Sequence, residues 1–226
     1  MKATSIFVLP LGIPLSVLIV FLFSIVLLGC ETKVEIPGSL VMSEAEYENW
    51  EIALVEMRIE KNEEFSDPAE SPLKEASHPE FEGLNYFFPK KELVFRTPFV
   101  ASAGTDTVSL TKRKGDVVPY LKRGNVSFVL EGQINTLAIF GPADTAHGDY
   151  LWLPFYDETS GKSTYGGGRY LDVEISPDGL VDLDFNYSYN PLCDYNAEKY
   201  NCTLPPEENR LPFKVEAGEK SFSANH

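Results

Sequence analysis

The chain has few of the residues that build metal and redox centres, and it has little positive charge. Its 226 residues include three cysteines and three histidines, and 19 Lys and Arg stand against 34 Asp and Glu. A formal net charge of −15 leaves no basic surface for a phosphate backbone, so nucleic acid is excluded as a partner. The same charge excludes electrostatic attachment to anionic lipid. We interpret the acidic surplus as a solubilising surface.

Long apolar runs are absent except at the N-terminus. That run follows a cationic start at Lys2 and ends in Leu27-Leu28-Gly29-Cys30. This layout is typical of a bacterial lipoprotein signal, so we expect residues 1–29 to be removed and Cys30 to be lipidated. The protein would then sit in the cell envelope, held on a bacterial membrane by its acyl chains and facing the periplasm or the exterior. An uncleaved transmembrane helix is the alternative, although Pro10 and Pro14 interrupt the run.

The other two cysteines, Cys193 and Cys202, are separated by eight residues. In an oxidising envelope such a pair is most simply a disulfide. The two cysteines could alternatively be zinc ligands, but the spacing is not Cys-x-x-Cys and the histidines lie far away in sequence. A catalytic thiol lacks a nearby histidine as its base. An intermolecular disulfide or a redox role is a further alternative.

Removing the signal leaves 197 residues, enough for one domain. We expect residues 30–42 to be a lipidated tether and residues 43–226 to form a single globular domain. Ser43 and Glu46 make a capping-box pattern that predicts a helix over residues 43–65. Its apolar positions at helical spacing should cover a sheet, with the acidic residues in water: Tyr47, Trp50, Ala53, Leu54 and Met57.

From residue 84 to 220 the pattern changes to short β-rich runs and turns. The turns are expected at residues 103–104, 114–115, 123–124 and 132. Closely spaced strands with short turns predict an antiparallel meander closed as a β-sandwich or barrel, so the fold is expected to be mainly β with one N-terminal amphipathic helix. The expected strands are Glu92–Ala101, Thr105–Thr111, Asp116–Leu121, Asn125–Glu131, Ile134–Phe140, Tyr150–Tyr156, Arg169–Ile175, Leu180–Tyr187 and Phe213–Glu216.

One hairpin should carry unusual charge. A three-residue loop at Pro177-Asp178-Gly179 would pair residue 175 with 181, 173 with 183 and 171 with 185. Asp172 would then lie opposite Asp184, and Glu174 opposite Asp182. Like charges placed directly opposite are destabilising. Exposure to water would relieve them, whereas a covered ladder needs a divalent cation, a basic side chain or a shared proton.

Glycines precede this hairpin, in Thr164-Tyr165-Gly166-Gly167-Gly168-Arg169-Tyr170. Three glycines beside an arginine are compatible with an anion-binding nest. They are not a phosphate-binding or dinucleotide-binding loop, because the next element is a strand. A glycine-rich turn or bulge, with Arg169 paired to Asp157 or Asp184, is the simpler interpretation.

The main functional hypothesis is a non-catalytic lipoprotein domain that binds a small ligand or an envelope protein and needs no cofactor. The alternative is an envelope hydrolase in which Asp157, Asp172 and Asp184 act with or without a divalent cation, while Arg169 holds an anionic group. Neither Gly-x-Ser-x-Gly nor His-Glu-x-x-His is present, so no catalytic residue can be named. The candidate ligand-binding residues are Asp157, Thr164, Tyr165, Arg169, Tyr170, Asp172, Asp184 and Asn186.

A series of motifs in fixed order runs through residues 45–220. The series resembles a prokaryotic family known only as domain of unknown function 1684. Asp194 and Thr203 depart from its usual pattern, at positions outside the candidate site. The resemblance implies the identity of the domain and no activity, cofactor or catalytic residue. The motifs are Ser71-Pro-Leu, Phe81-Glu-Gly-Leu-Asn-Tyr-Phe, Pro154-Phe-Tyr-Asp-Glu-Thr-Ser-Gly, Thr164-Tyr-Gly-Gly-Gly-Arg-Tyr-Leu-Asp, Asp184-Phe-Asn, Tyr189-Asn-Pro-Leu-Cys-Asp-Tyr-Asn, Cys202-Thr-Leu-Pro-Pro-Glu-Glu-Asn and Ala217-Gly-Glu-Lys.

Overall fold

The computed structural model describes residues 36–144 and 150–222, which belong to the unit formed by residues 36–226. The predicted signal, Cys30 and the first part of the predicted tether lie outside the described residues. Within the described part, no helix is long and apolar enough to cross a membrane.

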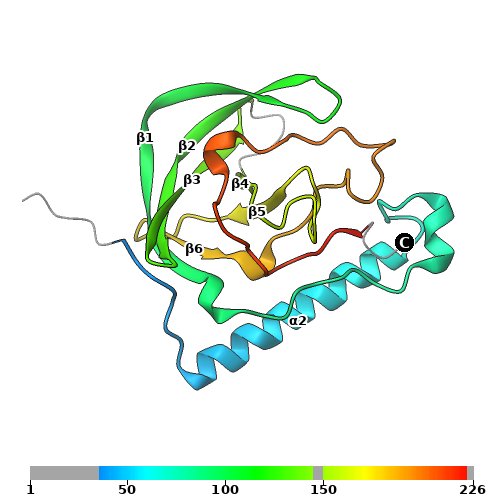
Figure 1. Cartoon of the computed structure of the whole chain (residues 1–226), viewed down its shortest axis with the longest axis horizontal. Helices are drawn as coiled ribbons and strands as arrows, with labels where there is room; N and C mark the ends of the chain where they lie inside the picture. Colours follow the sequence, from blue (N-terminus) through cyan, green and yellow to red (C-terminus); the bar gives the residue numbers. More distant parts are fainter. Residues whose placement is uncertain (1–35, 145–149, 223–226) are drawn as a thin grey trace, which may run out of the picture. The chain divides into compact units, whose positions relative to one another are not determined.

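A single antiparallel sheet of six strands, curled into a half-barrel, makes up most of the fold (Figure 1). The strand order is β5-β4-β3-β2-β1-β6, so the chain runs as a meander from β1 to β5 and β6 returns to pair with β1. The expectation of a mainly β fold with one N-terminal helix is confirmed. The strands are β1 (Val94–Thr111), β2 (Val117–Leu130), β3 (Gln133–Pro142), β4 (Leu151–Phe155), β5 (Arg169–Val173) and β6 (Leu180–Asp184).

Two predicted turns are instead irregularities inside long strands. The pairing of β1 with β2 shifts register between Ala101 and Asp106, and that of β2 with β3 shifts between Lys122 and Gly124. Each glycine-containing pair therefore marks a bulge that bends a continuous strand rather than ending it. The turns at residues 114–115 and at 132 are present, with positive φ at Gly115 and Gly132. The predicted strand Phe213–Glu216 is wrong, since this segment is irregular.

The charged hairpin has the predicted turn, but the residues of its two strands do not pair as predicted. Ile175 pairs with Val181 in an isolated bridge, as the three-residue loop requires. Beyond it the two strands separate, because β5 pairs with β4 and β6 pairs with β1. The expected facing of Asp172 with Asp184 is therefore wrong: Asp172 is registered against Trp152 of β4, and Asp184 against Val94 of β1.

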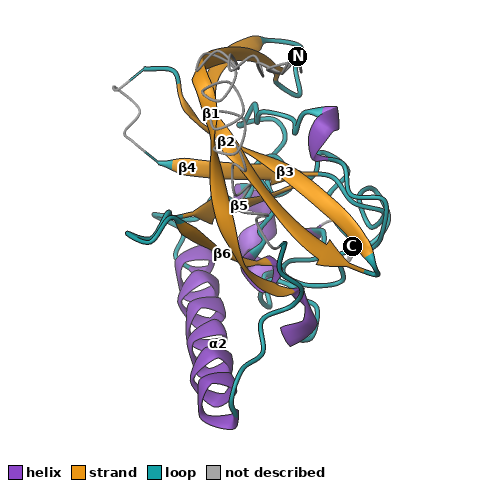
Figure 2. Cartoon of the chain, turned by 90° about the vertical axis from the view of Figure 1, so that its left-hand side faces the viewer, coloured by secondary structure: helices purple, strands orange, loops and turns teal. Residues whose placement is uncertain are grey.

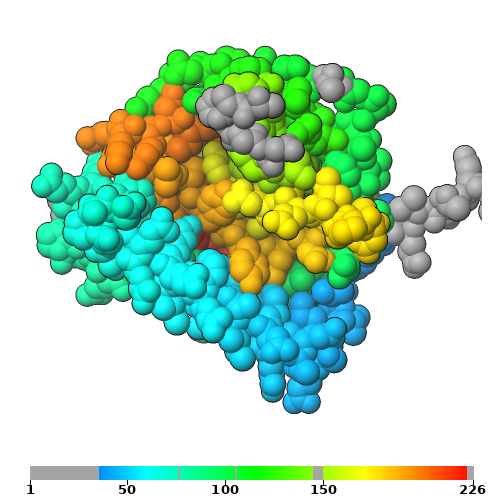
Figure 3. Space-filling view, turned by 180° about the vertical axis from the view of Figure 1, so that it is seen from behind, coloured from blue at the N-terminus to red at the C-terminus, as the bar shows by residue number. Residues whose placement is uncertain are grey.

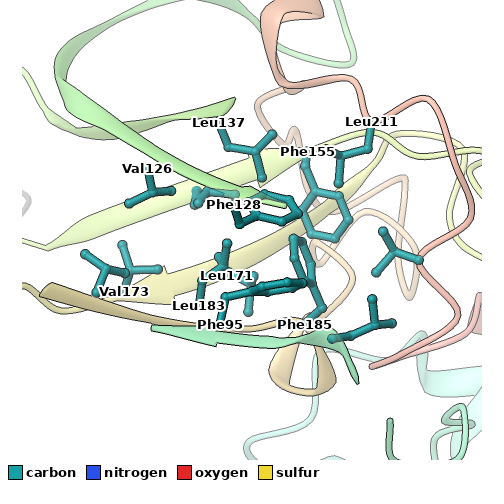
Figure 4. Close-up of a cluster of buried hydrophobic side chains, with 14 of the residues drawn as sticks. Phe95, Val126, Phe128, Leu137, Phe155, Leu171, Val173, Leu183, Phe185 and Leu211 are labelled. Atoms are coloured by element: carbon teal, nitrogen blue, oxygen red, sulfur yellow. The ribbon is translucent and has the colours of Figure 1, made fainter. Parts of the chain in front are cut away.

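The alternation of side chains creates two apolar clusters on opposite faces of the sheet. Leu137 and Leu171 point into the main core together with Phe95 and Phe185 (Figure 4). Leu153 belongs to the same cluster. The sequence neighbours of these leucines point to the other face and form a smaller cluster, because successive strand side chains alternate. That outer cluster contains Leu110, Ala138, Phe140, Trp152 and Tyr170, with Tyr120 and Tyr189 packed against it.

The segment that follows β6 completes the core without forming a strand. Leu211, Phe213, Val215 and Ala217 lie in the same cluster as the inward side chains of the sheet. The backbone of this segment also bonds to the turn after β4, where Tyr156 N–H donates to the carbonyl of Asn209 at 3.0 Å. Short 3-10 helices punctuate the connections: η1 (Glu75–Glu80), η2 (Lys91–Leu93), η4 (Phe185–Tyr187) and η5 (Glu207–Asn209).

The predicted helix is α2 (Glu44–Ser66), and its capping box is present in both directions between Ser43 and Glu46. The helix lies below β6 in two views (Figures 1 and 2). Leu54 and Phe65 are its buried residues, whereas Ala53, which the predicted stripe included, is exposed. One face of the helix is open at the molecular surface (Figure 3).

Candidate functional site

The first predicted pair, Asp157 and Arg169, lies in the interior. Asp157 follows β4, Arg169 begins β5, and a guanidinium nitrogen is 3.5 Å from the carboxylate. The same carboxylate accepts bonds from the Thr159 hydroxyl at 2.7 Å and from the Val215 backbone N–H at 2.7 Å. Thr164 extends this network, since its hydroxyl is 2.8 Å from that of Thr159. The prediction that Arg169 pairs with Asp157 or Asp184 is confirmed for Asp157.

Arg169 also binds the backbone of the irregular C-terminal segment. Its guanidinium donates to the carbonyls of Val215, at 2.7 Å, and of Ala217 and Glu219. The arginine is fully buried, and burial lowers its pKa while Asp157 opposes that change. Because both side chains are buried, the pair connects segments of the chain to one another and is not open to a ligand.

Two further candidate residues, Asp184 and Asn186, join β6 to α2 and to the loop before β1. Asp184 accepts a bond from the indole N–H of Trp50 at 2.5 Å and from the backbone N–H of Asn186 at 2.8 Å. The Asn186 amide holds the backbone of Lys90 on both sides, by accepting from its N–H and donating to its carbonyl. Burial raises the pKa of the Asp184 carboxyl, and the bonds from Trp50 and Asn186 act in the opposite direction.

The three candidate carboxylates do not share a site. Asp157 and Asp184 are bonded to the separate groups described above, and Asp172 is exposed and accepts from the Tyr189 hydroxyl at 2.9 Å. Among the described residues, no three His, Cys, Asp or Glu side chains come close enough together to hold a metal ion. The geometry therefore gives no support to the hydrolase alternative.

An aromatic cleft of about 640 Å³, which was not predicted from the sequence, lies on the outer face of the sheet. Two of the predicted residues, Tyr170 and Asp172, do line it. Four of its aromatic side chains come from three strands and a loop, namely Tyr120 of β2, Trp152 of β4, Tyr170 of β5, and Tyr189, which follows η4. The Trp152 and Tyr170 rings meet edge to face with centres 4.8 Å apart, and Tyr170 and Tyr189 do so at 5.8 Å. We call this feature the aromatic cleft.

Strand register explains why these side chains meet. Trp152 is the direct partner of Asp172 in β5 and of Phe140 in β3, so all three point to the outer face. Tyr170 lies two residues before Asp172 and therefore points the same way. The Tyr170 hydroxyl donates to the carbonyl of Thr203. Thr203 and its neighbour Cys202 also line the cleft.

Polar groups are set between the rings. Asp172 binds Tyr189, and burial raises the pKa of the Tyr189 hydroxyl, as does the nearby Asp172 charge. Lys61 of α2 forms an ion pair with the buried carboxylate of Glu219 at 2.5 Å, and its ammonium lies 5.1 Å from the centre of the Tyr189 ring. The pKa values of Tyr170 and Tyr189 are both raised by burial, so these two phenols remain neutral and act as hydrogen-bond donors at neutral pH.

A larger hollow of about 980 Å³ adjoins the aromatic cleft and shares Tyr150 and Asp172 with it. Its other walls include the exposed residues Glu174 and Ile175 of the charged hairpin. Burial raises the pKa of Tyr150 to about 12, and Tyr120 adds to this. The aromatic cleft is the better candidate, because it combines apolar walls with a small number of placed polar groups.

Two predicted features have structural roles. Cys193 and Cys202 form the expected disulfide, with Cα atoms 5.9 Å apart. Tyr165 is half-buried and covers Gly167, where an added Cβ would lie 2.3 Å from its ring. The glycine-rich stretch is thus a turn that leads into β5, and its arginine points into the core.

The fold and the cleft define a class of protein: a curled β domain, fastened internally by a buried arginine, with an aromatic cleft on its outer face. The family model described as "Protein of unknown function (DUF1684)" matches residues 79–220, and the chain belongs to this family. The chain is also similar to an uncharacterized protein of Haloarcula marismortui with a solution NMR structure. The two are 34% identical, the match covers 79% of this chain and 97% of that one, and the TM-score is 0.60. A comparison with curated proteins found no match.

Proposed function

We propose that this chain is a membrane-anchored envelope lipoprotein whose β domain binds a small ligand in the aromatic cleft without catalysing a reaction. The observation that carries the proposal is the cleft itself. Concave sites with mostly apolar walls and a few convergent polar groups are the usual form of a ligand site. Trp152 and Tyr170 supply the walls, while Asp172 and Asn190 supply the polar groups.

The burial of the other candidates supports a binding role over a hydrolytic one. Paired-carboxylate hydrolysis needs two carboxyl groups that flank one substrate bond. Asp157 is buried against Arg169, and Asp184 is covered by Trp50, so Asp172 is the one candidate carboxylate that faces the cleft. A single carboxylate among neutral phenols is suited to hydrogen bonding with a ligand.

The proposed anchor rests on the sequence from Leu27 to Cys30 and is tested by mass spectrometry. We expect the chain produced in a bacterial host to begin at Cys30 and to carry the mass of a lipid group. Cys30→Ser should abolish both processing and lipid. A wild-type chain of full-length mass without lipid would instead establish the transmembrane alternative.

The binding role is tested with a mixed panel of small molecules, which includes saccharides, nucleosides, quaternary amines and carboxylates. Ligand-observed NMR should detect at least one class that binds the wild type. Tyr120→Ala, which removes one wall, should weaken that binding, and Tyr120→Phe should preserve it because the ring remains. Binding that is insensitive to Tyr120→Ala, or no binding by any class, would overturn the cleft as a ligand site.

A further inference from the structure

The charges around the aromatic cleft are balanced. Two lysines and two acidic residues line it, namely Lys61, Lys112, Glu64 and Asp172. In a chain with a formal net charge of −15, this local balance contrasts with the acidic surface as a whole. A strongly charged ligand would be repelled by the lining residues of its own sign, so the cleft is suited to a ligand without net charge.

The rings disfavour a cationic ligand. Aromatic cages bind ammonium groups through the faces of their rings. Here the ammonium group of Lys61 already lies 5.1 Å from the centre of the Tyr189 ring and is paired with Glu219. An incoming cation would meet a resident positive charge at this wall. Of the remaining rings, Trp152 and Tyr170 are buried, whereas Tyr120 is half-buried and offers apolar ring surface to a ligand.

A buried acceptor in the lining points to a ligand that donates hydrogen bonds. Asn190 is 2% exposed, and its Oδ1 has no hydrogen-bond partner among the described residues. Its amide orientation is fixed, because Nδ2 donates to the carbonyl of Lys220 at 2.7 Å. A buried acceptor without a partner is costly, and a ligand hydroxyl at this wall would satisfy it.

Asp172 adds a second acceptor in the same cleft. The Tyr189 hydroxyl bonds to its Oδ1, and the side chain is exposed, so Oδ2 is available to a ligand donor. Flat apolar walls combined with two acceptors match one kind of molecule: a ring with an apolar face and hydroxyl groups around its edge.

We propose that the aromatic cleft binds a neutral saccharide, whose ring packs against Tyr120 and whose hydroxyls donate to Asp172 and Asn190. This inference rests on the proposed binding function and names its ligand class.

The test uses the full chain in a polyoxyethylene detergent, which has no sugar head group. The chain has two tryptophans, so Trp50→Phe leaves Trp152 as the single fluorescent reporter in the cleft. The probes are glucose, N-acetylglucosamine and their β-linked di- and trisaccharides, compared with tetramethylammonium, inorganic phosphate and adenosine. A saturable change in Trp152 emission with one of the neutral saccharides, and none with the other probes, is the expected result.

Two pairs of variants locate the binding. Tyr120→Ala should weaken saccharide binding about fivefold to tenfold, and Tyr120→Phe less than twofold. Asp172→Asn should weaken it, whereas Asp182→Asn, an exposed acid on β6 outside the lining, should not. Thermal melting of each variant establishes that the fold persists.

Each remaining outcome has one meaning. A Tyr120-dependent response to tetramethylammonium, phosphate or adenosine, with none to saccharides, would overturn the saccharide assignment and leave the binding function standing. Saccharide binding that survives Tyr120→Ala would place the sugar elsewhere and overturn the inference. No response to any probe class would overturn both the inference and the proposed function.

Discussion

At the scale of single residues, buried charged side chains connect segments that are distant in sequence. Arg169 has its charge satisfied by Asp157 and by carbonyls of the segment around Ala217, far from it in sequence. A buried ion pair adds little stability over an apolar pair, yet removal of one partner is strongly destabilising. The interior of this domain therefore tolerates loss of both charges better than loss of one.

Arg169→Met should lower the free energy of unfolding by about 3–5 kcal/mol, because Asp157 is left as an uncompensated buried charge. Urea denaturation followed by circular dichroism measures the change. Lys74→Met is the matched control, since it breaks an exposed ion pair with Glu198 and should cost less than about 1 kcal/mol. Equal effects of the two substitutions would contradict this account of Arg169.

Asp184 should make stability depend on pH. Burial raises the pKa of its folded-state carboxyl above the unfolded value, so the folded protein binds more protons between the two values. Its contribution is complete below the unfolded pKa, near 4, and is lost as pH rises through the folded pKa. In urea midpoints measured from pH 4 to 7, Asp184→Asn should therefore gain relative to wild type as pH rises.

Asp178 provides the opposite control for this titration. A hydrogen bond from Ser176 lowers the pKa of its carboxyl, so its contribution is present above the unfolded pKa and is lost as pH falls. Asp178→Asn should thus gain relative to wild type as pH falls toward 3. Differences with the same sign for both variants would contradict the assignment of Asp184.

At the scale of elements, close approach rather than turn formation explains Gly124. An added Cβ there would lie 2.4 Å from the Val100 carbonyl oxygen and 2.6 Å from the Phe99 ring. Gly124→Ala should destabilise the domain by about 1–3 kcal/mol through overpacking where β1 and β2 bend. Gly104→Ala, at the other irregularity, meets nothing closer than 3.8 Å and should be near neutral in the same urea titration. A neutral Gly124→Ala would show that the bend relaxes.

The elements also show what a sequence alone can predict. The start of α2 was predictable because the capping box between Ser43 and Glu46 is a local signal. The inward face of β5, with Leu171 and Val173, followed from strict alternation. Ala53 was misplaced because the side of a helix that packs is decided by distant partners, which periodicity does not report.

The facing of Asp172 with Asp184 was predicted wrongly, and the aromatic cleft was not predicted, for the same physical reason: both depend on pairing between strands that are distant in sequence. Asp172 and Asp184 are near in sequence, and only the pairing of β5 with β4 and of β6 with β1 shows that they separate. The walls of the cleft come from elements far apart in sequence, from Tyr120 to Tyr189. The one available signal was the alternate spacing of Tyr170 and Asp172 in a strand. This spacing shows that both side chains lie on the same face of the strand, but it does not show which residues of other strands lie beside them.

At the scale of the whole molecule, the disulfide stabilises a fold that other contacts already hold. The backbone around Cys193 and Cys202 is tied to β1 through the N–H of Leu204, which donates to the carbonyl of Thr111 at 2.8 Å. Replacing both cysteines by serine should lower the free energy of unfolding by about 2–3 kcal/mol, in the chain-entropy model, and leave the fold intact.

Chemical denaturation with and without reductant measures this effect. Reductant should destabilise the wild type by about the same amount, within the same chain-entropy model, and should leave the double variant unchanged. A wild type that is insensitive to reductant would contradict a disulfide that stabilises the fold.

The guanidinium of Arg169 also has a consequence for biosynthesis. Its acceptor at Glu219 lies 50 residues further along the chain. A ribosome must therefore add those residues before Arg169 can leave water, and the sheet cannot close around it earlier. Throughout that interval the carbonyl acceptors of the guanidinium are missing, so the growing chain cannot bury this charge without a large cost. The contacts that fasten the finished domain therefore make its closure a late event in synthesis.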